Sequence, residues 1–400
     1  MTVIVNDYFL LPPNWGDTFN YKRIWRTSIQ FSIDAHEKRS ALFTWPRRNL
    51  RFSIITLTAQ ETNYMIRKFY KNLHNVWGIP YWINAVDLTS QASSGQAVLN
   101  AEAITNLNFE VGAECIIFVD ENNYEVGTIL SLTTNTITLD ANLSTTWASG
   151  ITVYPILKTR LQLQQTASQQ VVGVSEFELS AIEIPDTDVI HTPLTTALFP
   201  VYKSKSVFNI LPNWESELKL ELNHNFDQLK WLGKEYSSSI INETTLRLSM
   251  NFLKETNSET DEILAFFDDH KGRCDRFWLP SQNNDIIITS GFLNTDITFD
   301  IEDIDWTVYW DEMNTAGHHI QFRFSDGASI YREITSMPTT TSMTIDSAIG
   351  VDVSQEELVT LTVSFLYQAR FDIDEIEATK PTYEISEFNL KFATIYGAQQ

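Results

Sequence analysis

The sequence predicts a mainly β protein with two tandem β-sheet units, each with one flanking helix and one inserted small β-barrel. Three observations lead to this prediction. The chain has 400 residues, more than one hydrophobic core usually spans. Short motifs in the first half recur in the same order in the second half. Between these motifs, short runs rich in β-branched and aromatic residues alternate with polar turns.

The internal repeat fixes the expected domain boundaries. Three motifs of the first half recur in the second: Leu11, Pro13, Asn14 and Trp15 as Leu211, Pro212, Asn213 and Trp214; Leu50 to Ile54 as Leu246 to Met250; and Ser175 to Leu179 as Ser386 to Leu390. A shared order of matches indicates duplication of a whole unit. We therefore expect units at 1–190 and 201–400, with a linker at 191–200 inside the Pro- and Thr-containing stretch 185–200.

Each unit is expected to hold one helix, at 59–71 and at 258–269. Both segments open with Thr or Ser and carry acids in the first turn. Their apolar residues fall on one helical stripe each: Met65, Ile66, Phe69 and Tyr70 in the first, and Ile263, Leu264, Phe266 and Phe267 in the second. Each helix then leads through a glycine, Gly78 or Gly272, into an aromatic pair, which we match as Tyr81-Trp82 and Phe277-Trp278.

The inserted barrels are expected at about 92–156 and 288–362. Short strands are predicted at 114–119, 124–132 and 136–139, and in the second unit at 319–324, 330–335 and 342–345. Polar turns such as 120–123 and 325–328 join them. Strand content should therefore exceed helix content several-fold.

Charge and composition exclude several classes of protein. Hydrophobic residues make up 43% and aromatic residues 12% of the chain, which is ample for packed cores. The 51 Asp and Glu against 28 Lys and Arg give a formal charge of −23 at pH 7. This charge repels DNA phosphates and anionic lipids, so it disfavours direct binding to nucleic acid or membranes.

Cysteine usage and the N-terminus indicate assembly inside a cell. Cys115 and Cys274 are far apart, with no second thiol or paired histidine near either, so neither a disulfide framework nor a zinc site is expected. The first residues lack a basic stretch followed by an apolar core, and no run of 18 apolar residues occurs. We expect no secretory signal and no membrane span.

With these residues laid out, the chain resembles the distal tail and baseplate hub proteins of long-tailed phages and gene transfer agents. The basic segments 37–39 and 45–48, followed by the strand 49–53, are similar to one part of that family's repeat unit. The segments 263–267, 271–273 and 277–280 are similar to the helix, link and aromatic strand that follow. The ending Val153-Tyr154-Pro155 resembles the end of small barrels in tail proteins. The second unit departs from the pattern, since Ser237 to Ser239 stand where the basic segment is expected.

The resemblance implies a tail-tube-like fold whose sheets pair edge to edge around a ring. It implies a structural virion protein of the tail baseplate, assembled in the host cytoplasm, with no enzymatic activity and no cofactor or metal. Two units per chain favour a homotrimer with pseudo-sixfold symmetry, with a hexamer as the alternative. Its partners would be copies of itself, the tail tube protein, and tail-tip, hub or fibre proteins. DNA would only pass through an acidic lumen.

One basic run stands out in this acidic chain and supplies the candidate contact residues. Arg39, Arg47, Arg48 and Arg51 lie within thirteen positions, beside Trp45 and Pro46. We interpret them as subunit contacts for an acidic neighbour in the ring, in preference to nucleic-acid binding.

Two functions from other classes remain open on the sequence. A carbohydrate-binding adhesion module of the tail tip could stack sugars on Trp82, Trp147, Trp278, Trp306 and Trp310, although core packing or subunit contact is favoured for these rings. A glycoside hydrolase, the remoter alternative, could draw a carboxylate pair from Asp300, Glu302, Asp303, Asp305 and Glu312. Solvated surface acids explain that cluster better.

Other candidate sites are weaker still. Alternation in a strand would point His318 and His319 to opposite faces, which disfavours a shared metal. The segment Asp268-Asp269-His270 is expected to be a helix end, with Gly272 as the stop. The sequence has no nucleophile elbow, Walker lysine or glycine-rich nucleotide fingerprint.

Overall fold

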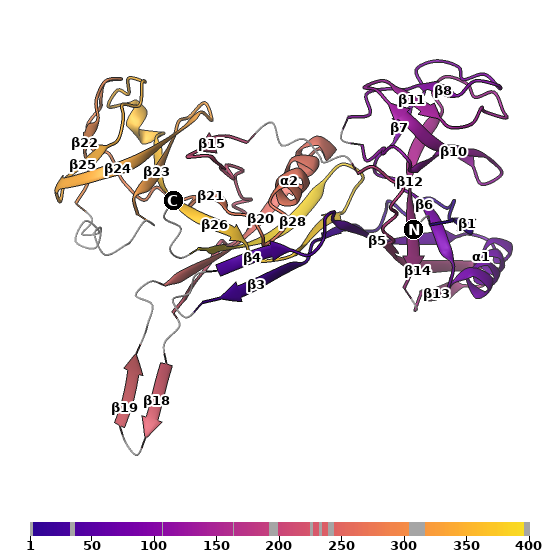
Figure 1. The fold of residues 1–400 in the computed structure, drawn as a ribbon, viewed down its shortest axis with the longest axis horizontal. Helices are drawn as coiled ribbons and strands as arrows, with labels where there is room; N and C mark the ends of the chain where they lie inside the picture. The colour runs from indigo at the N-terminus through magenta and orange to yellow at the C-terminus, as the bar shows by residue number, and fades with distance from the viewer. Residues whose placement is uncertain are drawn as a thin grey trace.

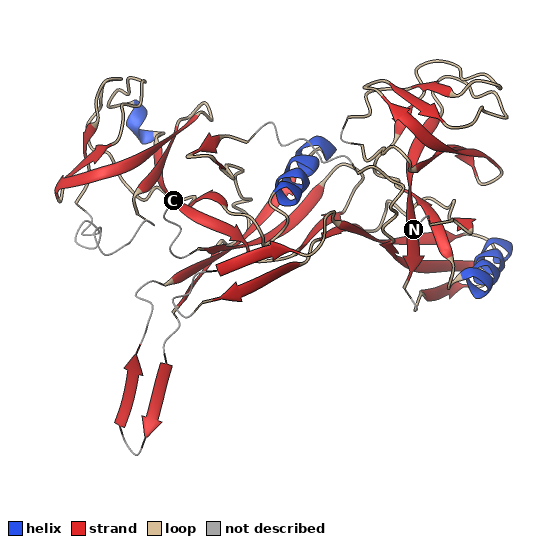
Figure 2. Ribbon diagram, in the orientation of Figure 1, coloured by secondary structure: helices blue, strands red, loops and turns tan. Residues whose placement is uncertain are grey.

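The protein is mainly β, as predicted. A computed structural model describes residues 3–32, 37–105, 107–162, 164–191, 199–224, 227–231, 234–238, 244–303 and 317–395. Within these residues, strands β1 to β28 accompany only two α-helices, α1 (Ala59–Asn72) and α2 (Asn257–Asp269), and one 3-10 segment, η2 (Glu357–Val359). Figures 1 and 2 show an elongated molecule with a small barrel at each end and α2 near its middle.

A single antiparallel sheet of eight strands, here called the central sheet, runs through both halves. Its order is β13 (Thr166–Val171), β14 (Val174–Glu183), β5 (Arg47–Thr56), β2 (Phe19–Ile24), β27 (Glu375–Lys380), β28 (Ser386–Thr394), β20 (Thr245–Lys254) and β17 (Lys219–Asn223). The join between the halves is β2 against β27, with Phe19 opposite Lys380 and Ile24 opposite Glu375. The two halves therefore meet strand to strand.

The alternation of residues in these strands separates an apolar face from a polar face. In β5, Leu50, Phe52 and Ile54 point into the core, whereas Asn49 and Arg51 lie on the opposite face. One continuous hydrophobic core extends from the first half to the second and includes buried residues of both helices. The helices thus cover the apolar face of the central sheet (Figure 1).

Both helices begin at a threonine cap, as their sequences predict. The Thr58 side chain accepts a hydrogen bond from the Glu61 backbone N–H, and Thr256 accepts one from Glu259 in the same way. In α2, all four residues of the predicted apolar stripe are buried. In α1 the stripe is only half right, because Ile66 and Tyr70 are 49% and 94% exposed.

Two small barrels stand apart from the central sheet, each with its own core. The first comprises β7 (Val86–Asp87), β8 (Val98–Asn100), β9 (Glu114–Asp120), β10 (Asn123–Leu132), β11 (Thr136–Leu139) and the start of β12 (Thr152–Leu161). The second comprises β22 (Thr298–Asp300), β23 (His319–Arg323), β24 (Ser329–Thr339), β25 (Ser342–Ile345) and the start of β26 (Thr362–Phe371). The strands predicted for both barrels are present at nearly the predicted residues.

The remaining strands are short. β1 (Asp7–Tyr8) pairs in parallel with β6 (Val76–Pro80), and β21 (Phe277–Pro280) pairs with β26. Two hairpins project from the central sheet, β3 (Thr27–Phe31) with β4 (Glu37–Ala41) and β18 (Asp227–Trp231) with β19 (Lys234–Ser238). β15 (Val201–Tyr202) pairs with β16 (Lys205–Ser206). Gly78 lies inside β6 and not at a helix end. A Cβ at this position would stand 2.5 Å from the Tyr8 ring.

The strand registers align the two halves and correct two of the matches made on the sequence. Leu50 lies opposite Ala181, and Leu248 lies opposite Phe392, so Leu50 matches Leu248 and the predicted match with Leu246 is wrong by two residues. Pro80 lies opposite Ile156 in β12, and Pro280 lies opposite Leu366 in β26. This register matches Trp77 with Phe277 and so corrects our match of Phe277 with Tyr81. Both matches were made on residue type, whereas the register is set by the backbone hydrogen bonds. The division at 191–200 stays a prediction, since residues 192–198 lie outside the described residues.

Candidate assembly surface

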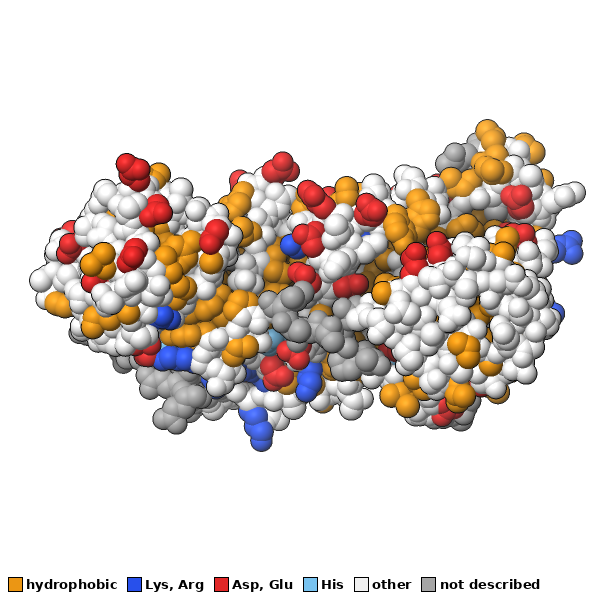
Figure 3. All heavy atoms as spheres, turned by 90° about the horizontal axis from the view of Figure 1, so that it is seen from above, with side chains coloured by type: hydrophobic (Ala, Val, Ile, Leu, Met, Phe, Trp, Pro, Cys, Tyr) orange, Lys and Arg blue, Asp and Glu red, His pale blue; other side chains and the backbone are white. Residues whose placement is uncertain are grey.

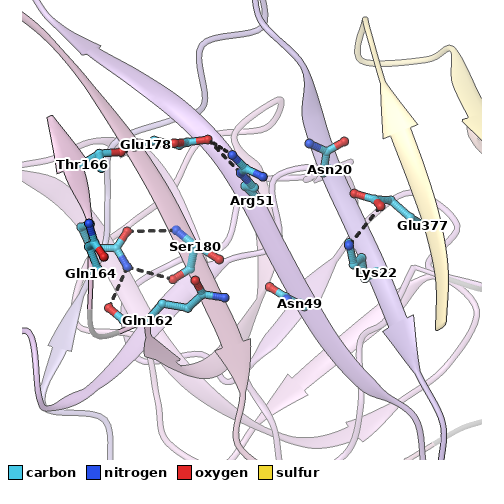
Figure 4. Close-up of a pocket in the computed structure, with 11 residues that line it drawn as sticks. Asn20, Lys22, Asn49, Arg51, Gln162, Gln164, Thr166, Glu178, Ser180 and Glu377 are labelled. Atoms are coloured by element: carbon cyan, nitrogen blue, oxygen red, sulfur yellow. Dashed lines mark hydrogen bonds and ion pairs between the residues drawn. The ribbon is translucent and has the colours of Figure 1, made fainter. Parts of the chain in front are cut away.

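The polar face of the central sheet carries charges of both signs. Ion pairs join Lys22 to Glu377 at 3.0 Å, Arg51 to Glu178, and Arg247 to Asp372 at 3.4 Å. Figure 4 shows the first two across β2, β5, β14 and β27, above a shallow depression floored by amides and hydroxyls. Because cations and carboxylates alternate, this face offers no run of cations to phosphates.

A buried ionic cluster fixes the join between the halves on the other side of β2. The Arg23 guanidinium in β2 is ion-paired with Asp268 at the end of α2, and the Trp25 indole N–H donates to the same carboxylate at 3.0 Å. Both arginines of the cluster, Arg23 and Arg48, donate to the side-chain oxygen of Asn108 at 3.2 Å. The cluster therefore links β2 and β5 of the central sheet, the segment before β9 in the first barrel, and α2.

Arg48 is a buried member of the cluster that contacts two carboxylates. Its guanidinium contacts Glu183 at 2.5 Å and Glu110 at 3.3 Å, and its side chain is 4% exposed. Burial acts to lower the pKa of Arg48, but the two carboxylates outweigh it and raise that pKa above its ordinary value. Burial likewise acts to raise the pKa of Glu110, yet Arg48 and His191 hold it below its usual value. These charges stabilise one another in place of water.

The β3–β4 hairpin extends from the first half onto the second. Glu37 accepts two hydrogen bonds from the Arg370 guanidinium, both at 2.9 Å. The Thr27 hydroxyl donates to Asp374 at 2.8 Å. This hairpin thus clamps β26 and the turn before β27.

The four predicted contact arginines do not form one surface. Arg39 lies on the hairpin beside Glu37, with a side chain only 12% exposed, and Arg47 is exposed over the Phe43 ring at 4.3 Å. Arg51 is exposed on the polar face, with its side chain 58% accessible. Arg48 is buried, and its contacts are all within the chain. Alternation along β5 places Arg48 and Arg51 on opposite faces.

The central sheet ends in two strands that the sequence analysis did not single out. Among the described residues, β13 pairs only with β14, and β17 only with β20. All five residues of β17 are exposed, including Leu220 at 51% and Leu222 at 68%. Unpaired edges with exposed apolar residues are sites for adding another strand. Alignment of Lys219 to Asn223 with β2 could have revealed them.

Neither a protein-family model nor a curated protein matches the sequence of this chain. The function proposed below therefore rests on the geometry of the described residues.

The alternative sites receive little support from their surroundings. Trp82, Trp147 and Trp278 are at most 4% exposed, so their rings are not free to stack on sugars, and Trp306 and Trp310 lie outside the described residues. So do Asp305 and Glu312 of the acidic cluster. No set of three His, Cys, Asp or Glu suited to a metal occurs in the described part of the chain.

His319 is a core residue. It stacks edge-on against Trp278 at 4.6 Å, and burial with nearby Lys203 lowers its pKa to about 4. It is therefore neutral near pH 7.

Neither described helix is long and apolar enough to cross a membrane.

A small cavity of about 160 Å³ lies between the halves, and the carboxyl group of Asp261 is buried beside it. Tyr21 and Tyr81 line it from the first half, and Asp261 and Lys380 from the second. Burial raises the pKa of Asp261 to about 7, although Arg23 and Lys380 act to lower it. The folded protein therefore holds this proton more tightly than the unfolded chain does.

The Asp261→Asn variant should be more stable than the wild type above pH 7. An acid with a raised folded-state pKa makes stability fall as pH rises from about 4 to about 7, because only the unfolded state ionises over that range. Removing the carboxylate should therefore gain on the order of 4 kcal/mol at pH 8 and nothing near pH 4. Thermal unfolding across pH measures this gain. Asp269→Asn, exposed on the same helix, is the control and should change little.

Proposed function

We propose that this protein is a structural component of a phage-type tail, a distal tail or baseplate hub protein whose copies join head to tail into a closed ring. Three chains with two units each give the ring six similar sectors, which would match a sixfold tail tube on one side and a tail tip on the other. The tail tube protein and tail-tip or fibre proteins are the partners this function requires. The protein performs no chemistry in this role.

The observation that carries the proposal is the join between β2 and β27. It shows that a sheet of the first half can pair edge to edge with a sheet of the second half, in one antiparallel register. The central sheet still ends in β13 and β17, which are open edges of the same kind. A head-to-tail contact that repeats the same rotation closes into a ring when that rotation divides a full turn.

The polar face supports a lumen that does not hold DNA. Three of its cations, Lys22, Arg51 and Arg247, are each paired with a carboxylate, and Glu221 and Asp372 lie beside Lys219 and Lys391 on the same face. Such pairs leave little net positive potential for phosphates, and the chain as a whole carries −23. Nucleic acid would pass this surface without strong binding.

The mass of the purified protein tests the proposal. Native mass spectrometry or light scattering over a wide concentration range should find a species of about three times 45.9 kDa, the mass of one chain. A protein that stays monomeric even at high concentration would contradict self-assembly. A species of six chains would contradict the threefold arrangement and favour a hexamer.

A further inference from the structure

We infer that β17 of one copy adds to β13 of the next copy, in the register that β2 adopts against β27, and that exposed apolar side chains beside both edges close this seam. The inference rests on the proposed ring and specifies its contact. The pairing of β2 with β27 within the chain is the template for this contact, because β17 corresponds to β2 and β13 corresponds to β27.

The first correspondence is between β17 and β2. Tyr21 of β2 lies opposite Leu50, and Leu220 of β17 lies opposite Leu248. Counted from the caps Thr58 and Thr256, Leu50 of β5 matches Leu248 of β20. Leu220 therefore occupies the position of Tyr21, and Leu218, two residues earlier, occupies that of Phe19.

The second correspondence is between β13 and β27. Ser168 of β13 lies opposite Glu176, and Thr379 of β27 lies opposite Glu387. Glu176 and Glu387 are the second residues of the matched Ser-Glu-Phe motifs. Ser168 therefore occupies the position of Thr379, and Ala167 that of Ala378.

These two correspondences give the register of the seam. Within the chain, Asn20 lies opposite Thr379, and Tyr21 lies opposite Ala378. The same pairing between copies places Lys219 opposite Ser168 of the next copy and Glu221 opposite Thr166. It places Leu220 opposite Ala167 of the next copy, on the core side of the sheet.

Exposure supports this assignment on the β17 side. Phe19 and Tyr21 are each 1% exposed, because both the sheet and the second half cover them. Leu220, at the position of Tyr21, is 51% exposed. A second copy at this edge would supply the missing cover, and burying a leucine side chain contributes roughly 1.5–3 kcal/mol.

Exposure supports the assignment on the β13 side as well. Counted from the caps Thr58 and Thr256, Ile66 of α1 matches Leu264 of α2, which is 2% exposed and lines one cavity with Tyr21. Ile66 itself is 49% exposed. Leu220 of one copy would thus pack against Ile66 of the next, as Tyr21 approaches Leu264 within the chain.

A third contact recurs at the turn beyond each strand. Trp15 packs edge-on against Tyr383, in the turn between β27 and β28, at 5.2 Å. Its counterpart Trp214 is 58% exposed. Val172, in the corresponding turn between β13 and β14, is 95% exposed. The same join would bring this pair together between copies.

The hairpins fit the same arrangement. The β3–β4 hairpin, between β2 and β5 in the chain, brings Glu37 to Arg370. The β18–β19 hairpin, between β17 and β20, projects away from the rest of the protein in Figure 1. Arg160 in β12 lies opposite Ile182, and Arg370 in β26 lies opposite Ala393, the matching residue of β28. Arg160 is therefore the counterpart of Arg370, but its side chain is exposed. The hairpin of a neighbouring copy would cover it.

Figure 3 shows orange hydrophobic side chains on the surface at both ends of the molecule. A partner of another kind would not explain why Leu220 and Ile66 are exposed where their counterparts Tyr21 and Leu264 are buried. A second copy of this chain explains it, because it carries both complementary edges.

Site-directed disulfide formation tests the register. The double variant Glu221→Cys/Thr166→Cys, made in a Cys274→Ser background, should form intermolecular disulfides on mild oxidation and yield a covalent trimer on a non-reducing gel. Residues directly opposite in antiparallel strands have Cα atoms about 4.5–5.5 Å apart, which a disulfide spans. Cys115 is buried and should not interfere.

The control is Glu221→Cys/Ser168→Cys, a pair two residues out of register on the same face. Its Cβ atoms would be about 7 Å apart, too far for a disulfide. Equal cross-linking of both pairs, or a particle with the mass of three chains and no cross-link, would overturn this seam while leaving the proposed ring standing. Monomers in the cysteine variants and in the unmodified protein alike would overturn both.

Discussion

The Leu220→Glu variant is expected to be a folded monomer under conditions in which the unmodified protein assembles. Leu220 is 51% exposed in the single chain, so the charge costs the monomer little. At the seam it would face Ala167 and Ile66 of the next copy, where an unpaired carboxylate is costly to bury. The lost burial and added penalty should weaken each contact by about 100-fold or more.

Leu293→Glu provides the matched control. Leu293 is 63% exposed, but it lies in the second barrel, away from both open edges. Light scattering measures assembly of both variants, and circular dichroism with thermal unfolding checks that each is folded. If Leu220→Glu and Leu293→Glu both assemble like the unmodified protein, the β17 edge is not the contact.

The Arg48→Ala variant is expected to lose about 3–5 kcal/mol of folding stability, the cost of breaking a buried ion pair by removing one partner. Its removal leaves the carboxylates of Glu183 and Glu110, 10% and 3% exposed, without their main counter-charge. It also removes one of two arginines that hold Asn108. The denaturation midpoint in urea should fall accordingly.

Arg51→Ala is the control on the same strand. Arg51 is paired with Glu178, but its side chain is 58% exposed, and exposed pairs contribute less than about 1 kcal/mol. Two arginines three residues apart should therefore differ several-fold in their effect on stability. Equal losses would contradict the structural role assigned to Arg48.

Local features of the fold were predictable from the sequence, and long-range pairings were not. Both helices and the barrel strands follow from caps, periodicity and turn residues within short windows. The pairing of β2 with β27 joins residues some 350 positions apart, and nothing near either strand encodes it. Arg48 looked like a surface cation, because its partner Glu183 lies 135 residues away in the sequence.

The open edges escaped the sequence analysis for a related reason. Leu220 and Leu222 alternate with polar residues, a pattern that predicts burial of both leucines on one face. Only the structure shows them exposed, because no strand or helix of the same chain reaches them. Likewise, the apolar stripe of α1 includes Ile66 and Tyr70, which the chain leaves exposed. Such residues indicate an assembly when their repeated counterparts are buried.

Face-on imaging of the assembled particle tests the central claim most directly. The account predicts a closed ring of three chains, in which six barrels form six peripheral lobes and the particle keeps threefold symmetry. An open filament would show that the copies join head to tail without closing, and would contradict the ring. A population of single elongated molecules at every concentration would contradict self-assembly altogether.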